Sequence, residues 1–277
     1  MGPSTVERVA ARDGTPLLVR RWHSDAGAAW GAVILVHGLA EHSGRWEHVG
    51  AHLSGAGLDV EAIDLRGFGA SGGRRAWIDR WSQFHDDLEE RIAAARARSA
   101  APVALYGHST GGLVALGYVL DGRVLPDALV ASAPALSSAG IALWKRLLAR
   151  ALARIAPGLY ISNGLDPADL SHDPTVVAGY ASDPLNVHRT TTRYGQAAFA
   201  EQRRVVAGLD RLTLPTLVIH GGEDRIVPTD SSALLEGRPG VTRRVYAGTR
   251  HELHNEPGSG AILDDVVGWL RDHLLHR

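Results

Sequence analysis

The feature of this chain that most constrains its fold is a series of short apolar segments, each separated from the next by a longer segment of helical character. The apolar runs are Gly31–Val36, Leu58–Ile63, Pro102–Tyr106, Ala128–Ala133, Pro215–Ile219 and Thr242–Tyr246. Most are nearly continuous and rich in β-branched residues, as expected of strands that are buried on both faces of a parallel sheet.

Helical segments alternate with these predicted strands. They are Trp46–Gly55, Trp81–Ser99, Gly111–Leu120, Ser231–Leu235 and Gly260–Leu275. This alternation predicts a doubly wound α/β sheet. Ahead of it, Val6–Trp22 predicts two further strands joined by a hairpin turn at Asp13-Gly14.

One interval between predicted strands is much longer than the others. About 80 residues separate Ala133 from Leu214 without a convincing core strand, whereas an ordinary connection has roughly 2–6 residues. This interval contains a helical stretch, then a loop rich in Pro, Gly and Asp, then further helical sequence to Gly208. We therefore predict a core made of residues 1–134 and 209–277, with residues 135–208 inserted as a helical cap.

The first predicted cap helix, Ile141–Ile155, is amphipathic. Its apolar face carries Ile141, Trp144, Leu148, Leu152 and Ile155, and another face carries Arg146, Arg150 and Arg154. Two interpretations remain open. The helix buries its apolar side against the body of the protein, or this basic amphipathic surface also makes transient contact with lipid or micelles.

A glycine-rich break, GHSTG at Gly107–Gly111, joins a predicted strand to a predicted helix. It fits G-x-S-x-G in the strand-to-helix context that a nucleophilic serine requires. A residue on so tight a turn has a strained backbone, so its neighbours two positions away must be small. The turn also places the Ser109 hydroxyl at a helix N-terminus, which favours developing negative charge. Ser109 is the predicted nucleophile, and a plain turn is the alternative.

A serine nucleophile needs a base, and the base needs an orienting acid. HGGEDRIVP follows the run Pro215–Ile219 and offers Asp224, with Glu223 as its rival. GTRHELHNE follows the last predicted strand and offers His251, with His254 as its rival. We favour His251 because it lies nearer the end of the strand, where the base should lie. For either acid, a solvated loop carboxylate is the alternative interpretation.

Two loops after early strands complete the predicted site. The tetrahedral oxyanion requires N–H donors, one from the residue after the nucleophile and one from a loop after an early strand. Thr110 is the first donor, and Leu39, in the loop HGLAEHSG, is the second. In that loop, Gly38 permits the turn and His37 is expected to brace it. The loop DLRGFGASGG lacks the strand–turn–helix order of a nucleotide site and is expected to buttress its neighbour.

Composition excludes several classes of function. A formal net charge of −1 gives no basic field for nucleic acid. With no cysteine, disulfides, thiolate metal sites and cysteine nucleophiles are absent. HELH nearly matches the zinc motif H-E-x-x-H, but its second histidine comes one residue early, so we predict no metal. No run approaches the roughly 20 apolar residues that span a bilayer, and the N-terminal segment lacks a signal-peptide core. We expect a soluble, cytoplasmic monomer or weak homo-oligomer, with peripheral membrane contact if the cap helix meets lipid.

These segments together resemble the monoacylglycerol lipase and lysophospholipase branch of the α/β-hydrolases, the serine aminopeptidase S33-like hydrolases. The matching phrases include LVHGLAEHSGRW, DLRGFGASGG, YGHSTGG, LPTLVIHGGEDRIVP and YAGTRHELHNE. The combination of HGxxEHSGR with H-E-L-x-N-E is specific, whereas G-x-S-x-G alone identifies only the superfamily. The resemblance implies an α/β-hydrolase fold with a mostly parallel eight-stranded sheet, flanking helices and an inserted helical cap.

The resemblance also implies a function and assigns its residues. Ser109, Asp224 and His251 would be the catalytic triad, and the N–H groups of Leu39 and Thr110 would form the oxyanion hole. The enzyme would cleave the small lipid ester of a monoacylglycerol to fatty acid and glycerol through an acyl-enzyme, without a cofactor. Alternatives with the same triad are a broad carboxylesterase, a lysophospholipase and an acyltransferase. A non-catalytic binding protein on this scaffold would be expected to lack a triad residue.

Substrate-binding residues are implied less directly. The resemblance points to Glu41 and to Tyr180, which lies before S-D-P-L and would contact the glycerol or another leaving group. Two features depart from the family pattern. Thr110 stands where the family usually has Met, which keeps the backbone donor but alters the local surface. The family has a basic residue near the alcohol site, and the sequence leaves open whether His188 or Arg189 occupies that position.

Overall fold

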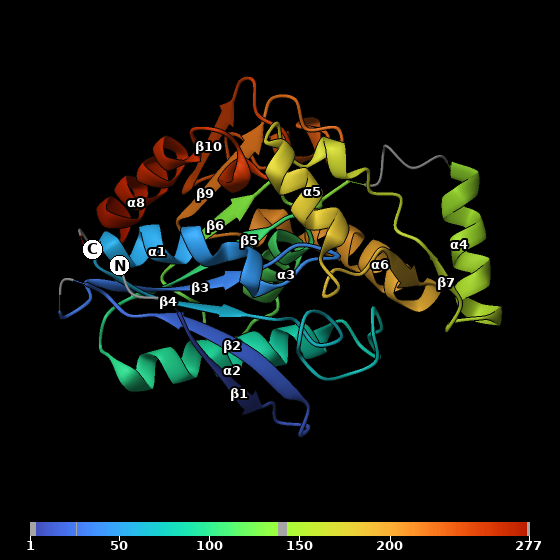
Figure 1. Cartoon of the computed structure of the whole chain (residues 1–277), viewed down its shortest axis with the longest axis horizontal. Helices are drawn as coiled ribbons and strands as arrows, with labels where there is room; N and C mark the ends of the chain where they lie inside the picture. Colours follow the sequence, from blue (N-terminus) through green and yellow to red (C-terminus); the bar gives the residue numbers. More distant parts are fainter. Residues whose placement is uncertain (1–3, 26, 138–142, 276–277) are drawn as a thin grey trace.

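The structure is a computed structural model that describes residues 4–25, 27–137 and 143–275. Its centre is an eight-stranded sheet in the spatial order β1-β2-β4-β3-β5-β6-β9-β10 (Figure 1). The strands of this sheet are β1 (Thr5–Ala10), β2 (Pro16–Trp22), β3 (Gly31–Val36), β4 (Leu58–Ile63), β5 (Val103–His108), β6 (Ala128–Ser132), β9 (Thr216–Gly221) and β10 (Val241–Tyr246).

Antiparallel pairing is confined to the strands at the β1 edge of the sheet. β1 and β2 form the predicted antiparallel hairpin, and β2 also pairs antiparallel with β4. The pairs from β4 through β3, β5, β6 and β9 to β10 are all parallel. Strands β3, β5 and β6 are buried along their whole length, as expected when helices cover both faces. The prediction of a mostly parallel, eight-stranded α/β sheet is confirmed.

Two hydrophobic cores cover the two faces of the sheet. Because alternate residues of a strand point to opposite faces, Ile34 and Val36 lie in one core and Val33 and Leu35 in the other. Helices α2 (Ser82–Arg98), α3 (Thr110–Val119) and α6 (Thr192–Gly208) pack into the first core. Helices α1 (Glu47–Gly55) and α8 (Ser259–Leu275) pack into the second, on the opposite face (Figure 1). The short α7 (Asp230–Ala233) follows β9.

Two strands extend beyond their apolar runs toward the candidate site. β5 continues past Tyr106 to His108, and β9 continues past Ile219 to Gly221. The added residues keep the backbone pairing of the sheet, for example His108 opposite Ser132. The hydropathy pattern does not predict this extension, because the hydrogen bonds between neighbouring strands are made by main-chain groups and do not require apolar side chains. As a result, the sheet itself positions the backbone immediately before Ser109.

Between β6 and β9 the chain forms further elements, none of which is a strand of the central sheet. They comprise α4 (Leu143–Ile155), α5 (Pro174–Ser182), α6, and the short strands β7 (Tyr160–Ser162) and β8 (Arg189–Thr191). β7 and β8 pair antiparallel in a sheet separate from the central one. The predicted helix at 141–155 is described from Leu143 onward, and Ile141 lies outside the described residues.

Helix α4 lies at the edge of the molecule, where it packs against α6 (Figure 1). Two large residues of its apolar face are exposed, Trp144 by 63% and Ile155 by 83%. Arg150 and Arg154 are exposed as well. Burial against the body of the protein therefore does not account for these two apolar side chains. Among the helices that the structure describes, each is too short or too polar to cross a membrane.

Candidate active site

Ser109 forms the turn between β5 and α3, at the carboxyl edge of the sheet. Its backbone has φ 53° and ψ −116°, and it caps the N-terminus of α3. A non-glycine residue in this region is strained, and such strain persists only where the surroundings hold it. The surroundings are tight. A Cβ on Gly111 would lie 2.1 Å from the carbonyl oxygen of Val36, and one on Gly107 would lie 2.4 Å from that of Gly111.

Asp224 and His251 meet on the loops that follow the neighbouring strands β9 and β10. His251 Nδ1 lies 2.7 Å from Asp224 Oδ2, and both residues are buried. Because an ionised carboxylate only accepts hydrogen bonds, Nδ1–H is the donor and Nε2 is left as an acceptor. The two loops approach closely at Gly221, where a Cβ would lie 2.1 Å from the carbonyl oxygen of Arg250.

The environment of this pair sets the charge of each member. Burial alone would raise the pKa of Asp224, but the attraction of His251 and hydrogen bonds from both His220 and His251 hold it well below its ordinary value. Burial alone would lower the pKa of His251, but the charge and hydrogen bond of Asp224 outweigh it and raise that pKa above the ordinary value. Asp224 is therefore ionised and favours the protonated form of the imidazole.

His220 is a partner of Asp224 that the sequence analysis did not single out. Its Nε2 lies 3.1 Å from Asp224 Oδ2 and 2.8 Å from the carbonyl oxygen of Val227. Since both neighbours are acceptors, Nε2–H donates. The N–H groups of Ile226 and Val227 donate to Asp224 Oδ1 at 2.9 Å and 2.8 Å. The segment HGGED at residues 220–224 indicates this contact in the sequence, because it places a histidine at the end of β9 and the acid one tight turn later.

The two rival residues lie in different surroundings. The Glu223 side chain is 56% exposed, and its carboxylate lies 3.5 Å from His172 Nε2. His254 is buried and stacks on Trp46, with ring centroids 4.1 Å apart. Neither ring nitrogen of His254 has a hydrogen-bond partner among the described residues. Burial and nearby positive charge lower the pKa of His254 well below its ordinary value. Among these candidates, the structure brings Asp224 and His251 together.

The loop after β3 lies against Ser109. A Cβ on Gly38 would lie 3.3 Å from Ser109 Cβ and 2.9 Å from Glu41 Oε1. The Gly38 N–H donates to that same oxygen at 2.6 Å, which requires the close approach. Within the described part of the chain, the N–H groups of Leu39 and Thr110 have no hydrogen-bond acceptor. Two backbone donors are thus unengaged beside Ser109.

His37 and the loop at residues 64–73 support the oxyanion loop from behind. His37 Nδ1–H donates to the carbonyl oxygen of Gly38 at 2.7 Å, and Nε2 accepts from the N–H of Leu65 at 2.9 Å. Burial lowers the pKa of His37, which keeps the ring neutral for this double role. Asp64 accepts from the N–H of Ser43 at 2.7 Å. His37 therefore braces the loop, as expected from the sequence.

An ion network connects the oxyanion loop to the histidine loop. Arg45 donates to Glu41 at 2.9 Å and to both oxygens of Glu252 at 2.6 Å and 2.7 Å. Glu252 follows His251 directly, so the guanidinium links the two loops. The Arg45 guanidinium also lies 5.0 Å from the ring centre of Tyr180. The pairing of Arg45 with Glu252 was not predicted, because it joins residues that are far apart in the chain.

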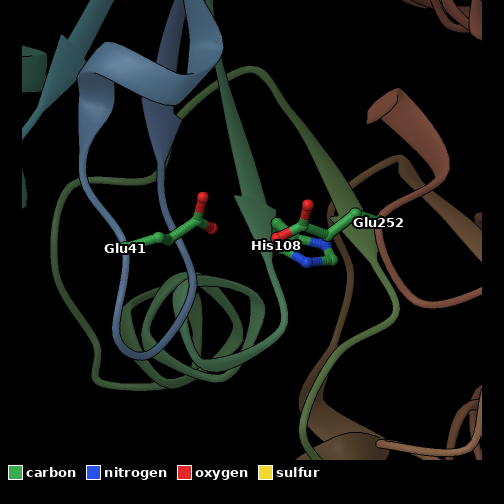
Figure 2. A group of neighbouring side chains, drawn as sticks. All are labelled: Glu41, His108 and Glu252. Carbon is green, nitrogen blue, oxygen red and sulfur yellow. The ribbon is translucent and has the colours of Figure 1, made fainter. Parts of the chain in front are cut away.

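Glu41, His108 and Glu252 lie together at the end of β5 (Figure 2). They offer potential metal-ligand atoms that all lie within 4.8 Å of one another. However, the Arg45 guanidinium hydrogen-bonds to both carboxylates, so a cation of the chain is already shared between them. His108 Nδ1 lies 3.2 Å from Ser132 Oγ. Ion pairing accounts for this cluster, and we assign no metal to it.

Tyr180 of α5 lies beside Arg45 and its ion network. It is 2% exposed and packs against Ala40 and Leu170. Its hydroxyl has no hydrogen-bond partner among the residues described. Burial, together with the Glu41 charge, raises the pKa of Tyr180 to about 12, so the hydroxyl stays protonated. The Glu252 N–H donates to the carbonyl oxygen of Leu170 at 2.8 Å, which ties the segment before α5 to the histidine loop.

Comparisons with known proteins agree with this architecture. Residues 27–258 match the hydrolase family described as serine aminopeptidase S33. A monoacylglycerol lipase of Mycolicibacterium smegmatis is 38% identical over 257 residues, covering 88% of this chain and 89% of that protein. The crystal structure of Paleococcus ferrophilus monoacylglycerol lipase has a TM-score of 0.83 at 32% identity, covering 93% of this chain and 99% of that chain.

A third comparison concerns the fold alone. A soluble variant of monoglyceride lipase from Saccharomyces cerevisiae, solved with a substrate analog, has a TM-score of 0.88 at 22% identity, with 99% of this chain and 97% of that chain covered. The family match and the 38% identical relative confirm the resemblance that the sequence motifs indicated. The chain therefore belongs to the serine aminopeptidase S33 family of α/β-hydrolases and is similar to monoacylglycerol lipases over most of its length.

Proposed function

We propose that the protein is a serine ester hydrolase that cleaves monoacylglycerols to fatty acid and glycerol through an acyl-enzyme. The observation that carries this proposal is the buried pair of His251 Nδ1 and Asp224 Oδ2, 2.7 Å apart, on loops at the same edge of the sheet as the strained Ser109. Neutral His251 takes the hydroxyl proton at Nε2 as Ser109 Oγ attacks the ester carbonyl. Asp224 holds the imidazole tautomer and stabilises the imidazolium.

The negative charge of the tetrahedral intermediate requires donors placed in advance. In this proposal the N–H groups of Leu39 and Thr110 supply them, and Thr110 adds the positive end of the α3 dipole. One such donor contributes about 2.7–4 kcal/mol where it has been measured in another hydrolase. The hydrogen bonds of Gly38 to Glu41 and His37 support this role, because they hold the loop before substrate binds.

The leaving alcohol receives a proton from the imidazolium, and water then hydrolyses the acyl-enzyme by the same route. We assign the alcohol to the region of Glu41 and Tyr180. Glu41 accepts from Gly38, Arg45 and Trp46, which uses three of roughly four acceptor sites of a carboxylate. One site remains for an alcohol O–H. The unpartnered Tyr180 hydroxyl is a donor for an alcohol oxygen.

Substrate preference is tested with a hydrolysis panel of monoacylglycerols, diacylglycerols, triacylglycerols, lysophospholipids and short esters of several acyl lengths. We expect kcat/KM for a monoacylglycerol to exceed that of the other lipids by about tenfold or more, since alcohol contacts are what discriminate among them. Turnover of soluble short esters without monoacylglycerol hydrolysis would instead indicate a broad carboxylesterase. A higher kcat/KM for lysophospholipids would favour the lysophospholipase alternative.

Residues 135–208 form the cap in this proposal, and α4 is its contact with lipid. Exposed Trp144 and Ile155 on one side of the helix, with exposed Arg150 and Arg154 on another, support it. Aromatic and aliphatic side chains enter the interface of a lipid surface while arginines remain near the head groups. The same surface would bring the enzyme to micelles or membranes that hold its substrate.

Replacing Trp144 and Ile155 with serine is expected to lower kcat/KM on monoacylglycerol dispersions by about tenfold and to leave the hydrolysis of a soluble ester within about twofold. The physical reason is that only the dispersed substrate requires contact with an interface. The double variant Val6→Ser, Val124→Ser is a matched control, because it removes two exposed apolar side chains elsewhere. Equal losses on both substrates would show that the helix acts through packing.

A further inference from the structure

His220 is a fully buried histidine to which the proposed mechanism gives no role. It lies near the end of β9, in the turn that leads to Asp224. Its Nε2–H is shared between Asp224 Oδ2, at 3.1 Å, and the carbonyl oxygen of Val227, at 2.8 Å. Oδ2 is also the oxygen that accepts from His251 Nδ1 at 2.7 Å. Two imidazoles therefore donate to one carboxylate oxygen.

The two oxygens of Asp224 are held by different kinds of donor. Oδ1 accepts from the N–H groups of Ile226 and Val227, which belong to the same tight turn. Oδ2 has no backbone donor within the described part of the chain, and its partners there are His220 and His251. Since His251 is the residue that Asp224 must orient, His220 is the independent contact that holds Oδ2 in place.

Ser232 and Arg243 fix the tautomer of His220. His220 Nδ1 lies 2.9 Å from Ser232 Oγ, and that oxygen accepts from Arg243 Nε at 3.0 Å. Ser232 Oγ also lies 3.0 Å from the carbonyl oxygen of Thr229, which already accepts from Arg243 Nη2 at 3.0 Å. The Ser232 O–H is thus available to Nδ1. A neutral imidazole with its hydrogen on Nε2 satisfies all of these contacts and presents a donor to Asp224.

A donor on Oδ2 affects the base as well as the acid. Burial raises the pKa of Asp224, but the charge of His251 and the hydrogen bond from His220 lower it further than burial raises it. Burial lowers the pKa of His251, but the charge of Asp224 raises it above the ordinary value. Because the hydrogen bond from His220 takes up part of that carboxylate charge, it weakens the hold of Asp224 on the imidazolium.

Other charged and titratable groups around His251 belong to several elements. Arg45 bridges Glu41 and Glu252, and the His108 ring lies 4.7 Å from the His251 ring, centre to centre. On the far side of Ser232, Arg243 pairs with Glu236 at 2.9 Å. A substitution at His220 leaves all of these groups in the chain. The groups around His251 besides Asp224 are Glu41, Arg45, His108, Glu252 and His254.

We propose that His220 is a positioning residue of the candidate triad. It holds Asp224 Oδ2 toward His251 and shares the charge of that oxygen, so that His251 is neutral, and able to act as the base, at lower pH. This role rests on the proposed ester hydrolase function. His220 acts through Asp224 and is assigned no contact with substrate.

The test compares two substitutions of His220, with a soluble p-nitrophenyl ester as substrate. His220→Leu is expected to move the acidic limb of kcat/KM to higher pH by about half a unit or more, because Asp224 then interacts with His251 alone. The plateau value of kcat should fall by about tenfold, with KM unchanged, because Oδ2 loses a fixed position. His220→Gln retains an N–H donor near the position of Nε2 and should keep the limb within about 0.2 unit of the wild type.

Three results would overturn the proposal. They are an acidic limb that stays in place or moves to lower pH in His220→Leu, a plateau kcat equal to that of the wild type, and equal displacement of the limb in the leucine and glutamine variants. Loss of packing alone lowers the amount of folded enzyme and does not displace the limb, so the pH profile separates a positioning role from a structural one.

His85→Leu is a matched control for the loss of a buried histidine. His85 is 2% exposed, and its Nδ1 lies 3.3 Å from an aspartate oxygen, Asp121 Oδ2. It belongs to α2, away from the loops that carry Asp224 and His251. Thermal unfolding measures the stability lost in each variant. The acidic limb of His85→Leu should coincide with that of the wild type, and an equal displacement in both leucine variants would contradict the role of His220.

Failure of the ester hydrolase proposal would be recognised separately, because the wild-type protein would then hydrolyse no ester. The contact is in that case judged by NMR titration of the His251 ring, whose signals are assigned by their absence in His251→Gln. A higher pKa of His251 in His220→Leu than in the wild type supports the role of His220, and an equal pKa contradicts it. An active wild type with a limb that is insensitive to His220→Leu overturns the role of His220 alone.

Discussion

Replacing Ser109 with alanine is expected to lower kcat for ester hydrolysis by about 10⁶-fold, the size of loss seen when another serine hydrolase loses its nucleophile. The reason is that no acyl-enzyme can form, and only the oxyanion donors and substrate binding remain to assist water. Initial rates on 1-octanoylglycerol and on a p-nitrophenyl ester measure the effect. KM should change little, since the hydroxyl contributes mainly to the transition state.

The fold of this variant should be intact. Alanine has the same Cβ as serine, so the strained backbone at φ 53° is neither relieved nor worsened. Thermal unfolding within a few degrees of the wild type would verify this. Ser54→Ala is a matched control, because Ser54 is also buried but lies in α1, on the opposite face of the sheet from α3. Retention of more than about 1% of wild-type activity by Ser109→Ala would contradict the assignment of the nucleophile.

The second large effect is expected for His251. The variant His251→Gln should lose about 10⁶-fold in kcat, because removal of the base from another serine hydrolase costs as much as removal of its nucleophile. The variant His254→Gln should lose less than about tenfold. Its ring nitrogens have no carboxylate partner among the described residues, and its lowered pKa makes it a weak proton acceptor. Measuring the two variants side by side decides which histidine is the base.

The pH dependence of the wild type offers an independent check on the same assignment. Only the neutral imidazole can accept the Ser109 proton, so kcat/KM must fall as pH drops through the pKa of His251. Asp224 raises that pKa, and the acidic limb should therefore lie above the ordinary histidine value of about 6.5. A fully active His254→Gln variant with an unchanged acidic limb of kcat/KM agrees with the assignment of His251 as the base. An inactive His254 variant beside an active His251 variant would reverse it.

Much of the fold was predictable because the signals are local. The apolar run Gly31–Val36 has the bounds that hydropathy suggested, since a strand buried on both faces is expected to be a nearly continuous apolar run. The long interval before Leu214 predicts a cap for a similar reason, as it offers no run that could pair within the sheet, and the cap remains a prediction. By contrast, β5 extends past Tyr106 because its pairing with β6 depends on main-chain groups.

Parts of the candidate site were also visible in the sequence. Ser109, Asp224 and His251 could be named because each follows a predicted strand, and parallel strands end at one edge of a sheet. The sequence placed His251 ahead of His254 and Asp224 ahead of Glu223, but it could not exclude the two rivals. Their exclusion depends on distance and burial, with Glu223 facing solvent and His254 stacked on Trp46.

By itself, then, the sequence determined the α/β sheet and the loops that carry the candidate catalytic residues, because these follow from periodicity and from short motifs. Only the tertiary structure decided which side chains meet. It pairs His220 with Asp224 and joins Arg45 to Glu252 across the chain. Such contacts join loops of separate strands, and their energies depend on separations of a few ångströms that no local pattern of residues records.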